Sequence, residues 1–443
     1  MELHERLAAT EPVADGLADP FAELKTRLHL GIIGELGPQL YNVSGDPAFV
    51  RQRVTDEIRT RLEAESGLSR SDREKLESEI AADILGYGPI EHMLSDESVS
   101  EIMVNGSHEI WIERDGLLYQ TPFRFNDESH LRRIINKMVG QVGRRIDESS
   151  PMVDARLPNG SRVNAIIPPL SLSGPLVTIR KFAQARFDLE DLIRVQTLSA
   201  DAVEFLQACV RAELNILISG GTGAGKTTLL NALSEAISDD ERTVTIEDAA
   251  ELQLKQQHVL RLEARPHNIE GEGEVSIRDL LRNTLRMRPD RIIVGEVRGA
   301  ESLDMLQAMN TGHDGSLSTV HANSPRDALH RLETMVLMAG FELPVRAIRQ
   351  QVAAALDLIV HLERLDDGTR KVTQVTEVQR MESEMITLQD LYTFEIEDVL
   401  PDRTVVGALH PTGLRPSTIG KFRKHGIDLP ARLFGLETVE LVR

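Results

Sequence analysis

Apolar residues recur at helical spacing through the first part of the chain. The pair Asp46-Pro47, which suits a helix cap and first turn, precedes a row of apolar residues with i, i+4 spacing. That row consists of Val50, Val54, Ile58 and Leu62. Ser71 and Glu74 have capping-box spacing and precede a second row. The second row consists of Leu76, Ile80 and Ile84. The pattern predicts an N-terminal helical region over residues 1–90, whose amphipathic helices form a bundle.

The apolar runs become shorter between residues 91 and 182. SEIMVNG, EIWIERDG and LLYQTPFRF are separated by Asn-Gly and Asp-Gly pairs, which are typical of hairpin turns. The segment from Leu131 to Val142 has a helical pattern, and RLPNGSRVNAIIPP and LVTIRKF suggest two more strands. We therefore expect a small α+β sheet domain over 91–182.

Strand and helix patterns alternate in the last part of the chain, after a linker expected over 183–198. Ser199 can cap a helix that carries Val203, Leu206 and Val210 on one face. The strand-like runs that follow are NILIS, TVTIED, RIIVGE and SLSTVHA. This alternation predicts an α/β domain over 199–443, with a mostly parallel sheet covered by helices on both faces and a C-terminal extension.

One turn of this domain has the chemistry of a phosphate site. ISGGTGAGKTT contains G-x-x-x-x-G-K-[ST] between a strand and a helix, so the match is more than a chance glycine turn. We expect the loop to bind nucleotide through Gly220, Gly221, Thr222, Gly223, Ala224, Gly225, Lys226, Thr227 and Thr228. Backbone N–H groups would hold phosphate oxygens, Lys226 would reach the β and γ phosphates, and Thr227 would offer a hydroxyl to Mg²⁺. The guanine-reading N-K-x-D does not follow the loop, which favours ATP over GTP.

Carboxylates follow two of the predicted strands. Glu247 and Asp248 end TVTIED, and Glu296 ends RIIVGE. In open α/β sheets ligands bind at the carboxyl ends of strands. One carboxylate could orient an attacking water and another could hold the magnesium shell, with Thr227, Glu247 and Glu296 as metal-site candidates. The alternative is that these are solvated strand ends.

Two histidines and three arginines are further candidates. His321 ends the strand SLSTVHA, and we favour a role for it in positioning or sensing the γ-phosphate; for His313 the question stays open. The arginines Arg156, Arg162 and Arg180 lie upstream of the linker. If subunits form a ring, this upstream domain could supply positive charge to a transition state. Surface arginines on strand edges are the alternative.

Composition narrows the class of protein. The 443 residues leave room for two or three domains, and a net charge of −20 argues against a protein that coats nucleic acid. Cys209 is the only cysteine, which fits a reducing compartment and excludes a multi-cysteine zinc module. No apolar run approaches the roughly 18 residues of a membrane span, and the first residues are too polar for a signal peptide. We expect a cytoplasmic protein that reaches a membrane through partners.

Four motifs in order resemble those of a known family. GGTGAGKTT, TIEDAAEL, RMRPDRIIVGEVRG and TGHDGSLSTVHANSPRDAL are similar to the Walker A, Asp-box, Walker B and His-box motifs of type II/IV secretion and pilus ATPases. Within this superfamily the chain most resembles the CpaF-type ATPases of Tad (Flp) pilus assembly, over roughly residues 80–435. Relatives with a four-cysteine zinc module are less similar, because this chain has Cys209 alone.

The resemblance implies a RecA-like P-loop NTPase core preceded by a PAS-like α+β domain. It implies a homohexamer that couples ATP hydrolysis to pilus assembly or retraction through an inner-membrane platform, with pilin handled indirectly. Glu296 matches the Walker B glutamate and Glu247 the acidic residue of the Asp box, and the choice of general base between them is open. His313 and His321 match the His box, and the three arginines lie where relatives bring charge from the N-terminal domain. A RecA-like nucleic-acid motor and a nucleotide-responsive scaffold are the alternatives.

Overall fold

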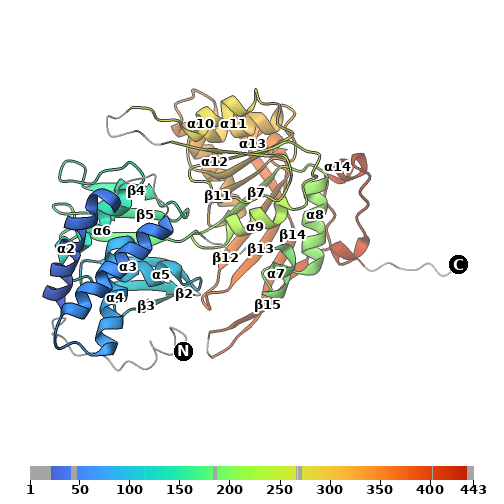
Figure 1. The fold of residues 1–443 in the computed structure, drawn as a ribbon. Coiled ribbons are helices and arrows are strands. Elements are labelled where there is room, and N and C mark those ends of the chain that lie inside the picture. Colours follow the sequence, from blue (N-terminus) through green and yellow to red (C-terminus); the bar gives the residue numbers. More distant parts are fainter. Residues whose placement is uncertain are drawn as a thin grey trace. The chain divides into compact units, whose positions relative to one another are not determined.

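The computed structural model describes residues 21–40, 47–114, 116–182, 187–265, 267, 272–401 and 403–436. The chain divides into two compact units, Met1–Gln184 and Ala185–Arg443 (Figure 1). None of the helices in these described residues is both long enough and apolar enough to cross a bilayer.

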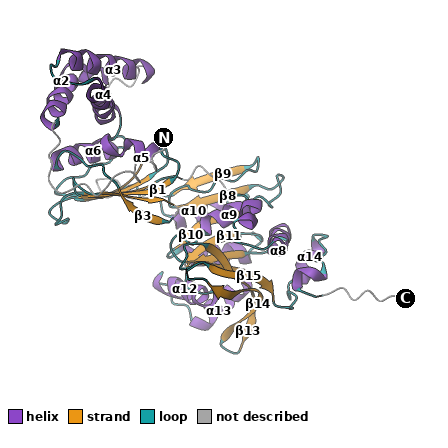
Figure 2. Cartoon of the chain, turned by 90° about the horizontal axis from the view of Figure 1, so that it is seen from below, coloured by secondary structure: helices purple, strands orange, loops and turns teal. Residues whose placement is uncertain are grey.

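In its described residues, the first part of the N-terminal unit consists of three helices (Figure 2). They are α2 (Ala22–Leu40), α3 (Pro47–Ala64) and α4 (Arg70–Leu85). Except for Val50, which is half-buried, the predicted apolar rows are buried in one cluster, which Leu28 and Ile32 of α2 join. The predicted cap of α4 is wrong by two residues, because Ser69 and Asp72 form the capping box. This pair has the same i, i+3 spacing as Ser71 and Glu74 but lies earlier in the chain, so the helix begins before them. Asp46 lies outside the described residues.

An antiparallel sheet forms the second part of this unit, in the order β3-β2-β1-β6-β5-β4. Its elements are η1 (Gly88–Ile90), α5 (Glu91–Ser95), β1 (Val99–Asn105), β2 (Ile110–Arg114), β3 (Leu117–Gln120), α6 (Glu128–Gly140), β4 (Met152–Arg156), β5 (Arg162–Ile166) and β6 (Leu176–Arg180). Helix α6 packs Leu131, Ile135 and Met138 into the core of the sheet. This is the expected PAS-like α+β domain. Strand β4 was missed, because Val153 is the one fully buried residue in it.

The C-terminal unit begins with two helices, α7 (Leu189–Arg194) and α8 (Ala200–Arg211). Part of the expected linker is therefore helical. The reason is local: Asp188 and Asp191 form a capping box, and Leu189 and Leu192 are buried. The predicted cap of α8 is confirmed, since the Ser199 side chain accepts a hydrogen bond from Ala202 N.

A nine-stranded sheet forms the body of this unit, in the order β15-β14-β13-β12-β7-β11-β10-β8-β9. Its first elements are β7 (Ile216–Gly220), α9 (Lys226–Ser234), β8 (Thr243–Glu247), β9 (Val259–Glu263), α10 (Ile277–Thr284), β10 (Arg291–Val297), α11 (Glu301–Asn310), β11 (Leu317–His321), α12 (Pro325–Met338) and α13 (Val345–Ala355). The remaining elements are β12 (Leu358–Arg364), β13 (Arg370–Glu382), β14 (Met385–Val399), β15 (Val405–Pro411), α14 (Ile419–Lys424) and η2 (Ala431–Phe434).

The strands from β12 to β9 are parallel, and those from β12 to β15 are antiparallel. The parallel part is the predicted RecA-like α/β core. The antiparallel part lies in the region that was expected only as a C-terminal extension.

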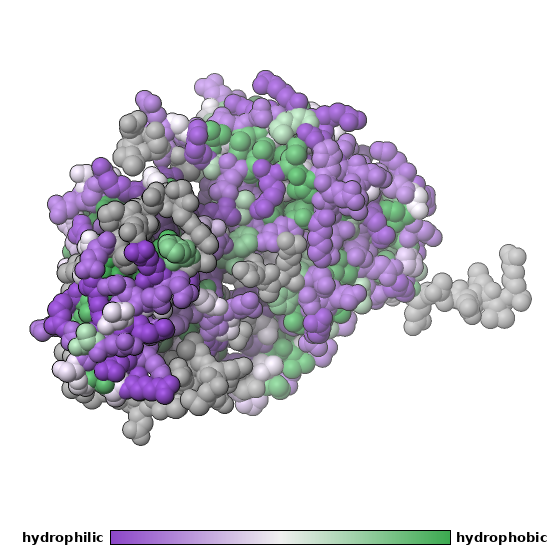
Figure 3. Space-filling view, viewed as in Figure 1, coloured by the Kyte–Doolittle hydropathy of each residue, from purple (hydrophilic) through white to green (hydrophobic). Residues whose placement is uncertain are grey.

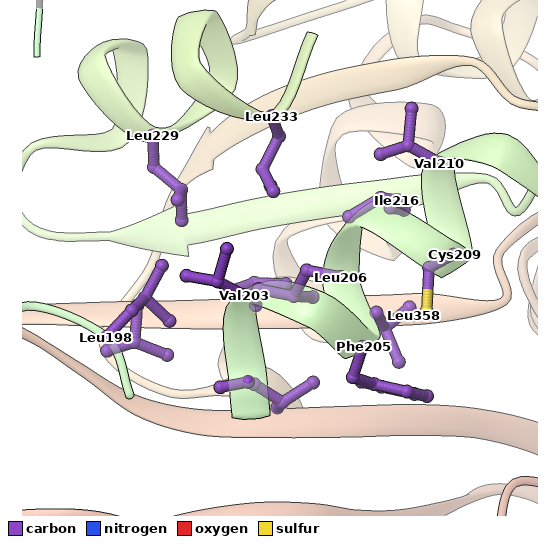
Figure 4. Packing of buried hydrophobic residues seen from close by; sticks show 14 of the residues in the cluster. Leu198, Val203, Phe205, Leu206, Cys209, Val210, Ile216, Leu229, Leu233 and Leu358 are labelled. Carbon is purple, nitrogen blue, oxygen red and sulfur yellow. The ribbon is translucent and has the colours of Figure 1, made fainter. Parts of the chain in front are cut away.

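Helices cover both faces of the parallel part, as predicted. Ile216 and Ile218 of β7 belong to the core that includes α8 and α9, and Leu217 between them belongs to the core that includes α11, α12 and α13. Figure 4 shows the first of these cores, in which Cys209 is buried. Burial raises the pKa of the Cys209 thiol well above its usual range. The predicted alternation of strands and helices is therefore confirmed, with one helix layer on each face of the parallel strands.

A buried arginine joins the amino ends of β8, β10 and β11 to the last turn of α8. Arg291, at the start of β10, is 1% exposed. Its Nη1 donates to the carbonyls of Val210 at 2.9 Å and Gly315 at 3.1 Å, and its Nη2 donates to Glu241 Oε1 at 3.0 Å. A Cβ on Gly315, whose φ is +77°, would clash with this guanidinium. Arg291 therefore holds the strand starts together.

The face of the molecule drawn in Figure 3 is mainly polar where its residues are described. Hydrophilic residues cover most of the face drawn in Figure 3, and hydrophobic ones form small separate patches. This agrees with a composition in which 27% of the residues are charged.

Candidate functional site

The phosphate loop joins β7 to α9. All five residues of β7 are buried, so the strand fixes the position of the loop at the carboxyl end of the sheet. Gly225 caps α9 with a φ of +97°, in the left-handed region where glycine is favoured. A Cβ on Gly220 would lie 2.4 Å from the carbonyl oxygen of Leu362 on β12. The glycines therefore let the loop turn sharply beside a neighbouring strand and present backbone N–H groups.

Lys226 closes the loop on itself. Its Nζ donates to the carbonyl oxygens of Gly220 at 3.0 Å and Gly221 at 2.9 Å. Burial lowers the pKa of the ammonium, while the Glu296 carboxylate raises it and the Arg298 guanidinium lowers it further. Thr227 and Thr228, in the first turn of α9, are half-buried. A desolvated cation at the N-terminus of a helix favours an anion at this place.

The other candidate groups of the core lie at the same edge of the sheet. Strands β7, β11, β10 and β8 are adjacent and parallel, so their carboxyl ends meet there. His321 is the register partner of Gly220, and Glu296 and Glu247 lie near the ends of the next two strands. The fold thus brings His321, both glutamates and the phosphate loop to one edge.

Glu247 is held from inside the protein. It is 3% exposed, and its Oε2 accepts hydrogen bonds from Glu251 N at 2.7 Å and Leu252 N at 2.9 Å. Its Oε1 is buried without a hydrogen-bond partner in the part of the chain that the structure describes. Burial raises the pKa of this carboxyl above its usual value, and the two backbone N–H groups oppose that effect. Glu247 thus fixes the turn after β8 and keeps one oxygen for another partner.

This burial predicts a pH dependence of stability. A carboxyl whose pKa is raised in the folded state binds more protons there than in the unfolded chain, so its contribution to stability falls with rising pH. The fall begins near the unfolded value of about 4.3 and ends above the raised folded value. Glu247→Gln keeps an oxygen acceptor and removes the titration. We expect the free energy of unfolding of the wild type, minus that of the variant, to decrease across this window in denaturant titrations. A difference that stays constant would contradict the assignment.

Glu296 is paired with an arginine that sequence analysis missed. Arg298 Nε donates to Glu296 Oε2 at 2.7 Å, and Arg298 Nη1 lies 3.6 Å from Asp248 Oδ2. The Glu296 side chain is 26% exposed. Arg298 stands two residues after Glu296 in the strand-end motif, and this adjacency was the available signal. The pair holds the glutamate at the mouth of the site within reach of solvent.

The two histidines lie at opposite ends of β11. His321 ends the strand beside the phosphate loop, whereas His313 lies on the turn before it, at the edge where the strands begin. The His313 carbonyl accepts a hydrogen bond from Ser316 Oγ at 2.8 Å. The fold of one chain therefore brings His321 to the phosphate loop and leaves His313 away from it. The phosphate-sensing role of His321 stays a prediction.

The three candidate arginines form a row in the N-terminal unit. Arg162 on β5 is the register partner of both Arg156 on β4 and Arg180 on β6. Arg180 Nε donates to Glu101 Oε1 at 2.6 Å. Like charges directly opposite one another in a sheet repel, and an anion bound across the row would relieve that repulsion. Delivery of this charge to a nucleotide stays a prediction.

The donor set fits a magnesium ion that keeps most of its water. Among the described residues no group of three or more His, Cys, Asp or Glu side chains could hold a metal. Mg²⁺ usually takes one or two protein carboxylates together with phosphate oxygens and waters. Thr227 offers a hydroxyl, Glu296 a carboxylate, and Glu247 the buried oxygen described above. These three candidates suit Mg²⁺ bound with a nucleotide, partly through water.

Two further residues beside the loop come from the distant strands β12 and β13. Arg370 Nε donates to the Gly223 carbonyl at 2.9 Å, across 147 positions of sequence. His361 is 1% exposed, and its Nδ1 lies 2.8 Å from Ser219 Oγ on β7. Burial lowers the pKa of His361, which favours the neutral ring. No local pattern distinguishes either residue, because their contacts arise only from the pairing of β12 with β7.

Comparisons with known proteins identify one family and several relatives. A family model described as "Type II/IV secretion system protein" matches residues 83–392. A putative conjugal transfer protein of Mycobacterium tuberculosis (strain ATCC 25618 / H37Rv) is 38% identical over 309 residues, which make up 68% of this chain and 87% of that protein. The type IV secretion system protein PtlH of Bordetella pertussis is 38% identical over 299 residues, covering 61% of this chain and 87% of that one. The VirB11 ATPase of the Brucella suis type IV secretion system, solved with sulphate, is 31% identical, covers 65% of this chain and 95% of its own, and has a TM-score of 0.37.

Proposed function

The chain belongs to the type II/IV secretion system protein family, and from this premise we propose that it is a magnesium-dependent ATPase that drives a secretion or pilus machine. The observation that carries the proposal is the single sheet edge on which the phosphate loop, His321, Glu296 and Glu247 meet.

ATP is the proposed substrate, and each side chain of the edge has a proposed part. The loop N–H groups and the N-terminus of α9 bind the phosphates, and Lys226 moves from the carbonyls of Gly220 and Gly221 onto a phosphate oxygen. Thr227 and Glu296 hold the metal, partly through water. When bound, Mg²⁺ supplies positive charge that offsets the charge developing on the phosphates.

Between the two glutamates, Glu296 is the better candidate for general base. Its side chain is partly exposed, and its carboxylate lies close enough to Lys226 to raise the pKa of that ammonium. It can therefore accept a proton from a water beside the phosphates. One oxygen of Glu247 is already occupied by two backbone N–H groups. We assign Glu247 to fixing the turn after β8 and to the outer shell of the metal.

This assignment predicts the behaviour of Glu296→Gln. The amide keeps an oxygen for Arg298 and for a water of the metal shell, so ATP affinity should change little, while turnover should fall by about 100-fold or more through loss of the base. Binding of a fluorescent ATP analogue and steady-state phosphate release measure the two effects. Asp248→Asn is a matched control, because Asp248 also lies near Arg298 and its side chain is 60% exposed; its turnover should stay close to that of the wild type. Loss of ATP binding in Glu296→Gln would indicate a structural role instead.

The assembly that we propose is a cytoplasmic homohexamer on an inner-membrane platform. In such a ring the row Arg156, Arg162 and Arg180 would bring charge to a bound nucleotide, and His321 would sense its γ-phosphate. The machine that we propose is a Tad pilus, on the motif resemblance and the single cysteine. Pilin would then be moved indirectly, through the platform.

A second candidate is a motor of a type IV secretion or conjugation apparatus, which the names of the two relatives at 38% identity favour. Deleting the gene separates the two: loss of surface fimbriae supports the pilus, and intact fimbriae with loss of protein or DNA export supports the second candidate. A motor acting directly on nucleic acid is less favoured, given a net charge of −20. Nucleic acid that stimulates ATP turnover would reverse that ranking.

A further inference from the structure

The hairpin of β12 and β13 lies against the phosphate loop and carries two arginines at its turn, Arg364 and Arg370. Arg370 Nε donates to the Gly223 carbonyl at 2.9 Å. A Cβ on Gly225 would lie 3.5 Å from Cδ of Arg370, and a Cβ on Gly223 would lie 3.9 Å from a terminal guanidinium nitrogen of Arg364. Both side chains are therefore packed around the glycines, with Arg370 in a direct hydrogen bond.

We propose that Arg370 is a positioning residue of the ATP site, which acts through the peptide group between Gly223 and Ala224. This proposal rests on the proposed function. A peptide group is planar and trans, so its C=O and N–H point in opposite directions. Arg370 holds the carbonyl on its own side and thereby turns the Ala224 N–H toward the interior of the loop, where the proposed phosphate would bind.

The Ala224 N–H is available to serve a ligand. Its contact within the described chain is a long one, 3.4 Å to the Gly221 carbonyl, which is a weak hydrogen bond. A phosphate oxygen would be a better acceptor, because a hydrogen bond to a charged group is stronger than one between neutral groups.

The hairpin can impose this orientation because it is itself fixed. Arg364 and Arg370 are register partners at the end of the β12–β13 pair, and β12 pairs along its length with β7. In the turn, the Asp367 carboxylate accepts hydrogen bonds from the N–H and hydroxyl of Thr369 and from Val405 N on β15. Arg370 therefore follows a turn that is hydrogen-bonded to β15, in a hairpin whose strand β12 is paired with β7.

The ligand class follows from this contact. The Gly223–Ala224 peptide serves phosphate and not the base, so the effect should apply to nucleoside di- and triphosphates alike. The contribution of the Ala224 N–H to phosphate binding should be the same in the ground state and in the transition state. Its loss should therefore raise KM and leave kcat nearly unchanged. A purely structural residue would lower stability and activity together.

The test compares three variants of the full chain with the wild type. Arg370→Gln is expected to raise the Kd for ADP and the KM for ATP by about tenfold, from loss of a charge-assisted hydrogen bond at an exposed site, with kcat and the melting temperature nearly unchanged. Arg370→Lys keeps a cationic N–H donor of similar reach and should recover most of the affinity. Arg380→Gln removes an exposed arginine from the same strand and should match the wild type.

Charge alone is tested separately with Arg364→Gln, which removes a cation from the same hairpin. An equal loss of affinity in that variant, or unchanged affinity in Arg370→Gln, would overturn the positioning role. A fall in kcat at constant KM would also overturn it. If the wild type neither bound nor hydrolysed ATP, the proposed function itself would fail, so the two failures are distinguishable.

Discussion

Replacing Lys226 by alanine is expected to reduce ATP turnover by about 100- to 1,000-fold, as for the loss of one preorganised donor to developing charge. The ammonium is half-buried at the mouth of the loop and donates to the carbonyls of Gly220 and Gly221. When it is removed, water can satisfy those carbonyls, and no core packing is lost. The fold should therefore stay intact while the phosphates lose their cation.

The measurement is phosphate release at saturating Mg·ATP, together with a thermal melt of each variant. Lys255→Ala is a matched control, since Lys255 lies in the same unit, its side chain is 51% exposed and it pairs with Glu235. That variant should hydrolyse ATP at the wild-type rate. Full turnover by Lys226→Ala would show that the loop does not hold the reacting phosphate.

Replacing Arg291 by alanine is expected to lower the free energy of unfolding by about 3 kcal/mol, the low end of the range for breaking a buried ion pair. The variant leaves the carbonyls of Val210 and Gly315 without their donor and the Glu241 carboxylate without its cation. The low end applies because the Glu241 side chain is 21% exposed and can be partly rehydrated. The site edge lies at the other end of the strands, so ATP affinity at low temperature should persist.

Urea titration of the two variants Arg291→Ala and Arg282→Ala gives the comparison. Arg282 also pairs with a carboxylate, Asp304, but its side chain is 53% exposed, and its loss should cost about 1 kcal/mol or less. Equal losses in both variants would mean that burial does not set the cost at Arg291. If a folded Arg291→Ala variant lost ATP binding, the contacts of Arg291 at the strand starts would affect the site at the opposite strand ends, contrary to our expectation.

The core and the phosphate loop were predictable because their signals are local. Buried parallel strands are continuous apolar runs, and the loop motif follows one of them directly, so the strand ends can be aligned from the amino-acid sequence alone. This alignment predicted that His321, Glu247 and Glu296 approach the loop. It favoured His321 and left His313 open, because the sequence motif contains both histidines; the structure places them at opposite ends of β11.

Two of the features that the sequence did not predict depend on contacts between distant segments of the chain. Arg370 meets Gly223 across 147 positions, and nothing near either residue indicates the pairing of β12 with β7. Arg291 stands among other arginines in RMRPDR, and charged residues are usually solvated, so its burial could not be inferred. Strand β4 was missed for a different reason. It lies at the edge of its sheet and buries few side chains, so its sequence shows no clear alternation of apolar and polar residues.

Cys209 gives the protein a practical property. The chain has this one cysteine, its side chain is fully enclosed by the core around α8, and its thiolate is disfavoured, so maleimide reagents should leave the native protein unmodified. A cysteine introduced at an exposed position would then be the one that reacts. Two such probes, one in each compact unit, would report the separation of the units by spin–spin distance or by energy transfer, with and without nucleotide, in an otherwise natural sequence.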